Sequence, residues 1–379
     1  MTDYSWINYK IELNRLPWHV WIKLGECAAK CEQIKSIPLK PHIREQLHLI
    51  YLAKGAHATT AIEGNTLSEQ QVKELIEKKL KLPPSKKYLE QEVNNIIEAC
   101  NKIAVDISKS NLREITVEQI CRYNNYVLGN DVPRDEAAVP GAIRAHNVVV
   151  GNVYRAPPAR QVSYLLQKFC NWMNGADFIN EQLQLHFAII KSIAAHLYMA
   201  WIHPFGDGNG RVARLLEFMI LLQSGVPSPA AHLLSNHYNI TRAEYYRQLD
   251  RAGKTDNPTG FFTYAIEGFL DGLQEQLQYI QGHIVSVCWR DFIYEVFSTQ
   301  HSNNTTKRRR ELAIRISEQA EQVDKNSILI LMRKEYRDRT ERTLSRDLNE
   351  LERLRLVKRQ KDRYAANKDL ILQFLPFST

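Results

Sequence analysis

The stretch 203–214, HPFGDGNGRVAR, concentrates residue types that bind phosphate and move protons. Its glycine, polar and charged residues are His203, Gly206, Asp207, Gly208, Asn209, Gly210, Arg211 and Arg214. Glycines let a backbone approach a ligand closely, and successive backbone N–H groups in such a loop form a concave anion site. Arg211 and Arg214 are spaced to share nearly one face of a helix start, where two guanidinium groups can bind phosphate oxygens. The pattern indicates a phosphate-transfer site.

Three side chains of this stretch could serve the chemistry of a transfer reaction. The imidazole of His203 can accept a proton from an attacking hydroxyl. Asp207 is a hard oxygen ligand suited to Mg²⁺ between two phosphate groups, and Asn209 can donate to a phosphate oxygen. No GKS or GKT follows the glycines, so the stretch is not a P-loop. The alternative is a glycine-rich helix connection with a packed histidine, which leaves the other polar residues unexplained.

Apolar segments on both sides must position this stretch. Residues 189–202 have apolar side chains at helical spacing, and a second apolar run follows Val212 and can end at Gly225. The sequence therefore predicts a helix, a tight glycine loop and a second helix. The N-terminus of the second helix adds its dipole and its unpaired N–H donors to the anion site.

The stretch resembles the Fic family signature, HPFx(D/E)GNGRxxR, at every fixed position. The resemblance implies a mainly α-helical Fic bundle that transfers AMP from ATP to a protein hydroxyl. It also implies that His203 is the general base and that Asp207 holds Mg²⁺. The phosphates would then be held by Gly206, Gly208, Asn209, Gly210, Arg211 and Arg214. These roles agree with the chemistry argued from the residues alone.

A second informative segment precedes the signature, at the end of a helix predicted over about 42–64. A glutamate before Gly-Asn is by itself most often a helix-end residue facing water. The segment resembles the Fic inhibitory motif, (S/T)xxxE(G/N), with Thr59, Glu63 and Gly64 in register. The resemblance implies that Glu63 pairs with Arg214 and occupies the place of the ATP γ-phosphate. The same glutamate could orient water for AMP removal, which leaves a bifunctional enzyme open.

Two further segments gain a role through the resemblance. Within 132–162, β-branched patches around Gly151 predict a short hairpin. The corresponding Fic hairpin is a flap that aligns a target chain by strand addition; the alternative is a purely structural hairpin. Tyr245 or Tyr246 lies where the family lines the adenine side and could stack on the base, with ordinary core packing as the alternative for either one.

The C-terminal part carries nearly all of the net charge of +8. From residue 300 onward the chain has 19 Lys+Arg and 12 Asp+Glu, a difference of +7. Three helical patterns and a VKRQKDRYAA hairpin resemble a winged helix-turn-helix. The third pattern has Arg342, Arg346 and Arg353 off a leucine stripe of Leu344, Leu348, Leu351 and Leu354. This helix could enter a DNA major groove; the alternative is a protein-interaction or dimerisation module.

Length and composition set the domain organisation. We predict an N-terminal helical region over 1–110, a Fic core over 111–298, a linker over 299–308 and a winged-helix domain over 309–379. A hydrophobic fraction of 44% and a charged fraction of 24% are ordinary for a soluble globular protein. The sequence has no run of 18 apolar residues, so it predicts no membrane span. Six scattered cysteines and the lack of a signal peptide predict a reduced, cytoplasmic protein.

Taken together, the residues and the resemblance lead us to expect an autoinhibited protein adenylyltransferase. ATP is the expected co-substrate, Mg²⁺ the cofactor, and a Ser, Thr or Tyr hydroxyl of a protein the target; a homodimer is expected from the family. One alternative is a DNA-binding transcription regulator whose Fic domain only senses nucleotide. Another is a Fic transferase that moves UMP or phosphocholine, because the base-binding surface lies outside the loop.

Overall fold

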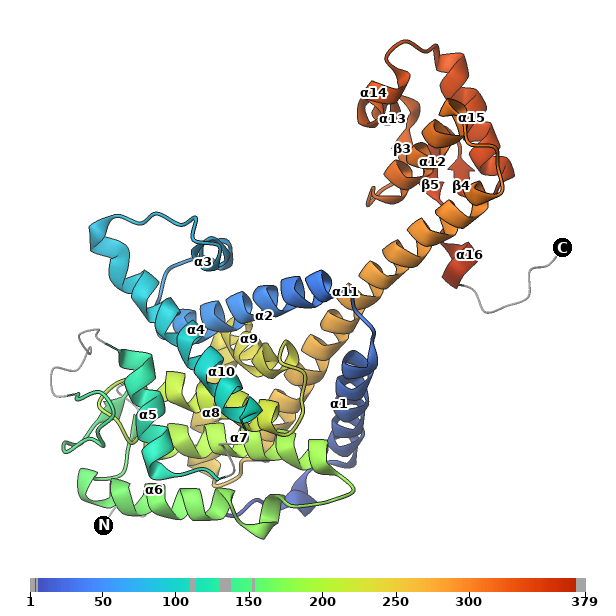
Figure 1. Ribbon diagram of the computed structural model, residues 1–379. Coiled ribbons are helices and arrows are strands. Elements are labelled where there is room, and N and C mark those ends of the chain that lie inside the picture. Colours follow the sequence, from blue (N-terminus) through green and yellow to red (C-terminus); the bar gives the residue numbers. More distant parts are fainter. Residues whose placement is uncertain (1–3, 5, 110–113, 130–137, 152–153, 373–379) are drawn as a thin grey trace. The chain divides into compact units, whose positions relative to one another are not determined.

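Two central helices carry the site loop between them. α7 (Gln184–Ile202) ends where the loop begins, and α8 (Asn209–Gln223) starts within it. Both helices are buried on almost all sides, because α4 and α5 pack against α8 while α1 and α6 pack against α7 (Figure 1). α7 is long and apolar enough to cross a membrane by length and composition, but 72% of that window is buried inside the molecule. It is the core helix of its unit.

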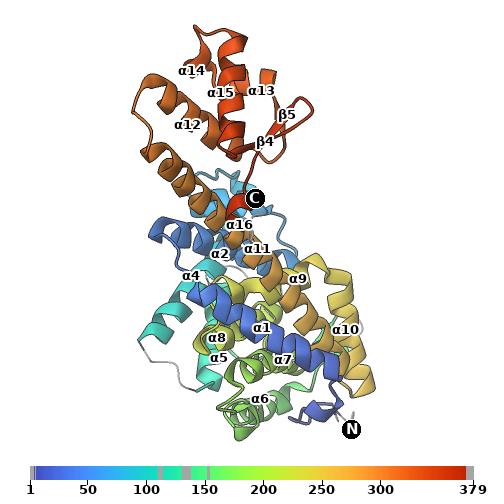
Figure 2. The ribbon, with the colours of Figure 1, turned by 90° about the vertical axis from the view of Figure 1, so that its right-hand side faces the viewer.

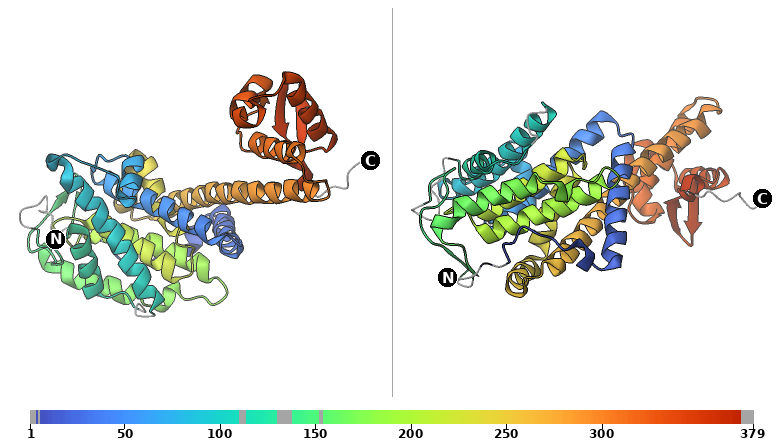
Figure 3. Two further views of the ribbon diagram at one scale, coloured as in Figure 1. Left: turned by 45° about the horizontal axis from the view of Figure 1, so that its top comes forward. Right: turned by 90° about the horizontal axis from the view of Figure 1, so that it is seen from below.

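The computed structural model describes residues 4, 6–109, 114–129, 138–151 and 154–372. It divides into two units, Met1–Gln276 and Leu277–Thr379. The division falls within α11 (Thr259–Ser298), which is a single helix of 40 residues. Figures 2 and 3 show the two units from further directions. Both are built mainly of helices, which confirms the predicted fold class.

The first unit contains helices and one small hairpin. Its other helices are α1 (Trp18–Ser36), α2 (Pro41–Ile62), α3 (Glu69–Ile76), α4 (Lys87–Ser108), α5 (Val117–Leu128), α6 (Ala159–Met173), α9 (Leu233–Ile240) and α10 (Arg242–Thr255). Short 3₁₀ turns lie at Leu13–Arg15, Pro84–Lys86, Ala176–Phe178 and Ala230–His232. The hairpin strands β1 (Val149–Val150) and β2 (Tyr154–Arg155) are antiparallel, with Val150 opposite Tyr154.

Local signals in the sequence account for several of these boundaries. Ser68 and Gln71 form a reciprocal capping box that starts α3. The Thr116 side chain accepts from the Gln119 N–H and starts α5. The predicted hairpin is present, with Gly151 at a φ of +57°, a conformation that favours glycine. Asn152, the second residue of the predicted turn, lies outside the described residues.

In its described residues, up to 372, the second unit combines four further helices, one short terminal helix and a three-stranded sheet. Its elements after α11 are α12 (Asn304–Ser317), β3 (Val323–Asp324), α13 (Lys325–Leu331), α14 (Arg333–Tyr336), α15 (Glu341–Arg353), β4 (Val357–Gln360), β5 (Arg363–Ala366) and α16 (Asp369–Leu372). The sheet order is β3-β5-β4, with antiparallel pairs. The predicted leucine stripe of α15 faces the core of this unit, where Leu344, Leu348 and Leu351 are fully buried.

The predicted linker and domain boundary need correction. Only 299–303 is non-helical, because α12 begins at Asn304, where the Asn303 side chain accepts from the Thr306 N–H at 2.9 Å. Within the predicted linker, Arg308 is buried and its Nε donates to Asp347 Oδ2 at 2.7 Å. Trp289, Ile293 and Phe297 of α11 belong to the core of the second unit. The second unit therefore begins inside α11 and not at residue 309.

Candidate active site

His203 ends α7 in a left-handed backbone conformation, with φ 50° and ψ 61°. Its Nδ1 lies 3.4 Å from the Ala200 carbonyl oxygen. A carbonyl only accepts, so Nδ1 carries the proton and Nε2 keeps its lone pair. Burial lowers the pKa of His203 to about 4, and the nearby Arg144 charge acts in the same direction. The imidazole is therefore neutral near pH 7, the form that can accept a proton.

Gly208 and Asn209 shape the loop between the two helices. Gly208 caps α8 at a φ of +78°, and a Cβ there would lie 3.1 Å from Asn124 Nδ2. The buried Asn209 side chain accepts from the Phe205 N–H at 2.9 Å and donates to the Phe205 carbonyl at 2.8 Å. Both ends of the amide therefore hold the loop, and the predicted donation from the second Nδ2 hydrogen of Asn209 to phosphate stays a prediction. Gly206 lies in the bend that this amide closes.

Asp207 and Arg211 hold each other at the mouth of the loop. Asp207 Oδ1 accepts from the Gly208 N–H at 2.6 Å, and Arg211 Nη2 lies 3.3 Å from both carboxylate oxygens. Arg211 Nη1 also lies 3.9 Å from Glu92 Oε1, and Glu92 Oε2 accepts from Asn65 Nδ2 at 2.9 Å. Glu92 thus joins the segment after α2 to a predicted phosphate-binding arginine, and the sequence analysis did not identify it.

Asp207 is the one predicted metal ligand in this loop. No cluster of three or more potential metal-binding side chains occurs among the described residues. Mg²⁺ commonly uses one or two protein carboxylates, with substrate phosphates and water as its remaining ligands. A single carboxylate beside an anion-binding loop fits a metal ion that binds together with nucleotide phosphates.

Glu63 and Arg214 form the predicted pair. Arg214 is only 2% exposed, and its Nη2 donates to Glu63 Oε1 at 2.5 Å and to the Thr59 carbonyl at 3.0 Å. Burial raises the pKa of Glu63, but the charge and hydrogen bond of Arg214 outweigh it and hold that pKa below its usual value. A Cβ on Gly210 would lie 2.3 Å from Glu63 Oε1. The carboxylate therefore covers Gly210 in the first turn of α8.

Two side chains of α10 donate hydrogen bonds to the last backbone carbonyls of α2. Arg242 donates through Nη1 to the Ala61 carbonyl at 3.2 Å and through Nη2 to the Ile62 carbonyl at 2.5 Å. The Tyr246 hydroxyl donates to the Ile62 carbonyl at 3.4 Å. A cation at the C-terminal end of a helix also opposes the negative end of its dipole. These carbonyls immediately precede Glu63, and Gly64 then turns the chain at a φ of +101°.

The structure separates the two tyrosines proposed for the adenine side. Tyr245 is 3% exposed, and its hydroxyl lies 2.9 Å from His196 Nε2. Its ring is stacked on Tyr238 with centroids 4.8 Å apart, so core packing is the correct alternative for Tyr245. Tyr246 is 46% exposed, and its base-stacking role stays a prediction.

Two buried polar residues that anchor the loop were also not identified from the sequence. Asn124 of α5 donates to the Asp207 carbonyl at 2.9 Å and accepts from the Gly141 N–H at 2.9 Å. Arg144 donates through Nε to the His203 carbonyl at 2.7 Å. A buried polar group needs a partner, so a polar residue on the inner face of a predicted helix was the one available signal, and it applies to Asn124 only.

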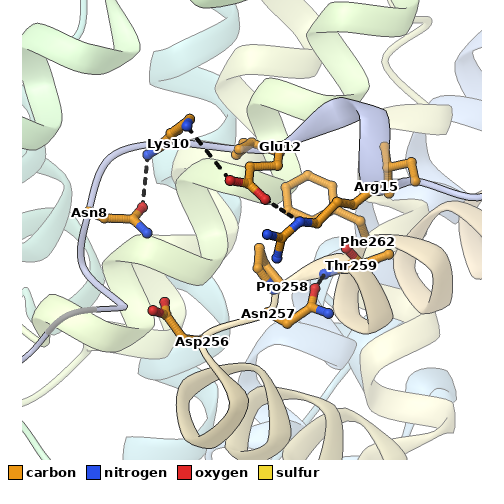
Figure 4. Close-up of a pocket in the computed structure, with 11 residues that line it drawn as sticks. Asn8, Lys10, Glu12, Arg15, Asp256, Asn257, Pro258, Thr259 and Phe262 are labelled. Carbon is orange, nitrogen blue, oxygen red and sulfur yellow. Dashed lines mark hydrogen bonds and ion pairs between the residues drawn. The ribbon is translucent and has the colours of Figure 1, made fainter.

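A cavity elsewhere in the first unit is unrelated to this site. It has a volume of about 150 Å³ and is lined by the N-terminal segment and by the start of α11. Figure 4 shows Glu12 between Lys10 and Arg15 on one side and Asn257 beside Thr259 on the other. None of the residues proposed for phosphate binding lines it.

Comparison with known proteins agrees with this geometry. Residues 114–221 match the model of the Fic/DOC family. Protein adenylyltransferase fic-1 of Caenorhabditis briggsae is 32% identical over 199 residues, which cover 52% of this chain and 36% of that protein. Protein adenylyltransferase Fic of Nematostella vectensis is 29% identical over 223 residues, which cover 58% of this chain and 47% of that protein. The chain thus spans less than half the length of these relatives.

Solved structures show the same fold. A segment of Fic-1 from C. elegans superposes with a TM-score of 0.55 at 25% identity, covering 69% of this chain and 73% of that one. A Fic family protein from Desulfovibrio desulfuricans G20 has a TM-score of 0.55 at 20% identity and covers 92% of this chain and 94% of its own. Residues 114–221 thus match the Fic/DOC family model, and the fold is that of solved Fic proteins.

Proposed function

We propose that this chain transfers AMP from ATP to hydroxyl side chains of proteins, and that Glu63 holds it in a state of low activity. The contact between Glu63 and Arg214 over the first turn of α8 carries this proposal. The relatives are named protein adenylyltransferases, which supports AMP as the transferred group. A Ser, Thr or Tyr residue of a protein supplies the hydroxyl.

In the proposed reaction the hydroxyl oxygen attacks the α-phosphorus of ATP. A new P–O bond forms, the bond from the α-phosphorus to the oxygen that bridges to the β-phosphate breaks, and pyrophosphate leaves. His203 Nε2 accepts the hydroxyl proton. The contact of Nδ1 with Ala200 supports this role, because it leaves Nε2 as the basic nitrogen. Transfer of this kind depends mainly on positioning and charge stabilisation.

The phosphates would lie on the loop and the first turn of α8. Backbone N–H groups of Asn209 and Gly210 and the side chains of Arg211 and Arg214 supply donors and positive charge there, and the Gly208 N–H would join them on leaving Asp207 Oδ1. Gly210 has no Cβ that could fill this space. Asp207 is the residue that would hold Mg²⁺, which neutralises phosphate charge when bound.

Autoinhibition follows from competition for one place. Glu63 lies against Gly210 and bonds Arg214, so a phosphate group can take that place only after the carboxylate leaves. The two negative charges also repel each other. Glu63 could orient a water molecule when AMP-modified protein is bound, so AMP removal is proposed as a second activity of the same site.

Labelling with ATP carrying ³²P at the α position tests the proposal. We expect little label on protein with the parent chain and strong label with Glu63→Gly. Adding His203→Ala to Glu63→Gly should abolish the label. Glu69→Gly is a matched control, because Glu69 is exposed at the start of α3. Labelled UTP and labelled CDP-choline test the alternatives of UMP and phosphocholine transfer. If the Glu63→Gly chain places no label on any protein, the proposed AMP transfer is contradicted.

We also propose that the second unit binds duplex DNA in the manner of a winged helix. Arg342, Arg346, Asn349 and Arg353 recur at helical spacing on the exposed side of α15. Arginine and asparagine are the side chains that read guanine and adenine edges in the major groove. No carboxylate of the described residues forms an ion pair with Arg342 or Arg346, so both guanidinium groups can meet DNA. Lys361 and Arg363 of the β4–β5 hairpin are exposed and can contact phosphates.

Binding of the full chain to labelled duplex DNA tests this second function. Affinity should fall with salt at a log–log slope of roughly 0.9 per phosphate contact. Arg342→Ala with Arg346→Ala should weaken binding, whereas Arg315→Ala should not, because Arg315 pairs with Glu311 and Glu318. No binding at low salt would favour the protein-interaction alternative. The homodimer and the cytoplasmic location stay predictions.

A further inference from the structure

Arg144 joins backbone groups from three places in the first unit. It is 4% exposed, and each of its three side-chain nitrogens donates to a different carbonyl. Nε donates to His203 at 2.7 Å, Nη1 to His146 at 2.8 Å and Nη2 to Pro157 at 2.5 Å. Its own backbone N–H donates to the Pro204 carbonyl at 3.0 Å. The residue therefore holds the site loop through two consecutive carbonyls.

Within the described part of the chain, the charge of Arg144 has no acidic partner. No carboxylate of the described residues lies within ion-pair distance of Arg144, and burial lowers the pKa of its guanidinium from the usual value. A buried charge is costly unless hydrogen bonds satisfy it. Here carbonyl dipoles satisfy it, and each of these bonds also fixes the direction of a peptide group. These hydrogen bonds thus replace the solvation of the Arg144 guanidinium by water and fix the geometry of the backbone around it.

Among these partners, His203 has a backbone conformation in the left-handed region. A non-glycine residue with φ 50° and ψ 61° is uncommon, because its Cβ crowds the following carbonyl. The bond from Arg144 Nε holds this carbonyl in place. The imidazole is attached to the same residue, so a fixed peptide plane on this side also limits where Nε2 can lie.

The other two carbonyls flank the hairpin. His146 precedes β1 and Pro157 follows β2, so one guanidinium ties both ends of the hairpin to the His203 backbone. A second bond in the same region runs from the Tyr154 hydroxyl to the Trp201 carbonyl at 2.7 Å. The hairpin and the end of α7 are therefore joined by side chains from the hairpin region at two points.

We propose that Arg144 is a positioning residue that sets the distance between the β1–β2 hairpin and His203 Nε2. The inference rests on the proposed AMP transfer, in which a target hydroxyl must reach that nitrogen. Arg144 donates to no side chain of the phosphate-binding loop, so its loss should affect the transfer step and not the binding of ATP. A misplacement of about 1 Å at a reacting group can cost roughly 100-fold in rate.

The test uses the full chain with Glu63→Gly as the parent. Arg144→Lys keeps the charge and offers a single donor nitrogen, and Arg144→Ala removes both. Arg160→Ala is the matched control, because Arg160 is an exposed arginine at the start of α6. The measurements are kcat, the Kd of ATP, and backbone hydrogen exchange over 200–206.

We expect kcat to fall roughly 10- to 100-fold in Arg144→Ala and less in Arg144→Lys, with the Kd of ATP within about threefold of the parent. Hydrogen exchange over 200–206 should be faster in both variants and unchanged in Arg160→Ala. A folded Arg144→Lys with the parent's kcat and exchange rates would overturn the inference, and so would a weaker Kd with an unchanged kcat. If Arg144→Ala does not fold, Arg144→Lys decides.

The failure of the proposed function is recognised separately. A Glu63→Gly parent that transfers no label contradicts AMP transfer whatever the Arg144 variants do. In that case the exchange rates still report whether Arg144 holds the His203 backbone. If the Glu63→Gly parent is active and Arg144→Lys has the same kcat and exchange rates, only the positioning role of Arg144 is contradicted.

Discussion

Glu63 and Arg214 lie 151 positions apart in the chain, yet Glu63 Oε1 accepts from Arg214 Nη2 at 2.5 Å. Arg214 lies near the N-terminus of α8, and Glu63 is the first residue after α2. The pair therefore connects the end of one helix to the start of another, at the place where donors for phosphate gather. Any change that opens this contact should free those donors for a nucleotide.

Replacing Glu63 with glycine should raise AMP transfer at least tenfold, which corresponds to about 1.4 kcal/mol of bias toward the closed state. The apparent affinity for ATP should rise with it, because fewer molecules hold Arg214 in the ion pair. Glu63→Gln removes the charge but keeps the size, so it should give a smaller gain. Label incorporation and ATP titration of the three proteins check this; equal incorporation would contradict the inhibitory role.

Replacing His203 with alanine in the Glu63→Gly chain should lower the transfer rate by roughly 10²- to 10⁴-fold. ATP binding should change little, because a general base contributes to the transition state more than to the ground state. Single-turnover labelling and equilibrium binding separate the two effects. Transfer within a few-fold of the parent would remove His203 from its assigned role.

The pH dependence of transfer should reflect the low pKa of His203. Burial lowers this pKa from 6.5 to about 4, so the neutral base persists as the pH falls below the usual histidine range. We expect kcat of the Glu63→Gly chain to stay level between pH 7.5 and pH 6 and to decline toward pH 4. A midpoint near 6.5 in the kcat profile would contradict the lowered pKa of His203.

Loss of the hydrogen bonds to the last backbone carbonyls of α2 should also raise the proposed AMP transfer. Arg242→Ala removes the donors to the Ala61 and Ile62 carbonyls, so Glu63 should leave Arg214 more often and basal labelling should rise a few-fold. Arg247→Ala is the control, because Arg247 pairs with Glu244 on the same helix. In the Glu63→Gly chain the Arg242 change should add nothing; a further gain there would assign Arg242 to another step.

The second unit should depend on one buried carboxylate. Asp347 accepts from Arg308 at 2.7 Å, from Arg309 at 2.8 Å and from the Tyr336 hydroxyl at 2.8 Å. Breaking a buried pair typically costs about 3 kcal/mol, so Asp347→Ala should speed hydrogen exchange in α12 and α15 roughly 100-fold. Asp362→Ala, at a 99% exposed side chain, should leave exchange unchanged. Equal exchange in both variants would show that this cluster does not stabilise the unit.

Features that depend on near neighbours could be predicted from the amino-acid sequence. Apolar spacing predicted α7 and α8, and the Ser68 and Thr116 side chains marked the starts of α3 and α5, because helices and caps form between residues a few positions apart. The residue types in the loop 203–214 indicated its chemistry. The Glu63–Arg214 pair was reached only through resemblance to a family, since nothing local links the two residues.

The distant residues that hold the site could be identified only in the folded structure. Asn124 and Arg144 reach the loop from 83 and 59 positions away, and no spacing in the sequence marks either contact. Tyr245 and Tyr246 are neighbours with the same side chain, yet packing buries one beside His196 and leaves the other at the surface. Burial and long-range hydrogen bonds are properties of packed elements, so they become definite only when the helices have come together.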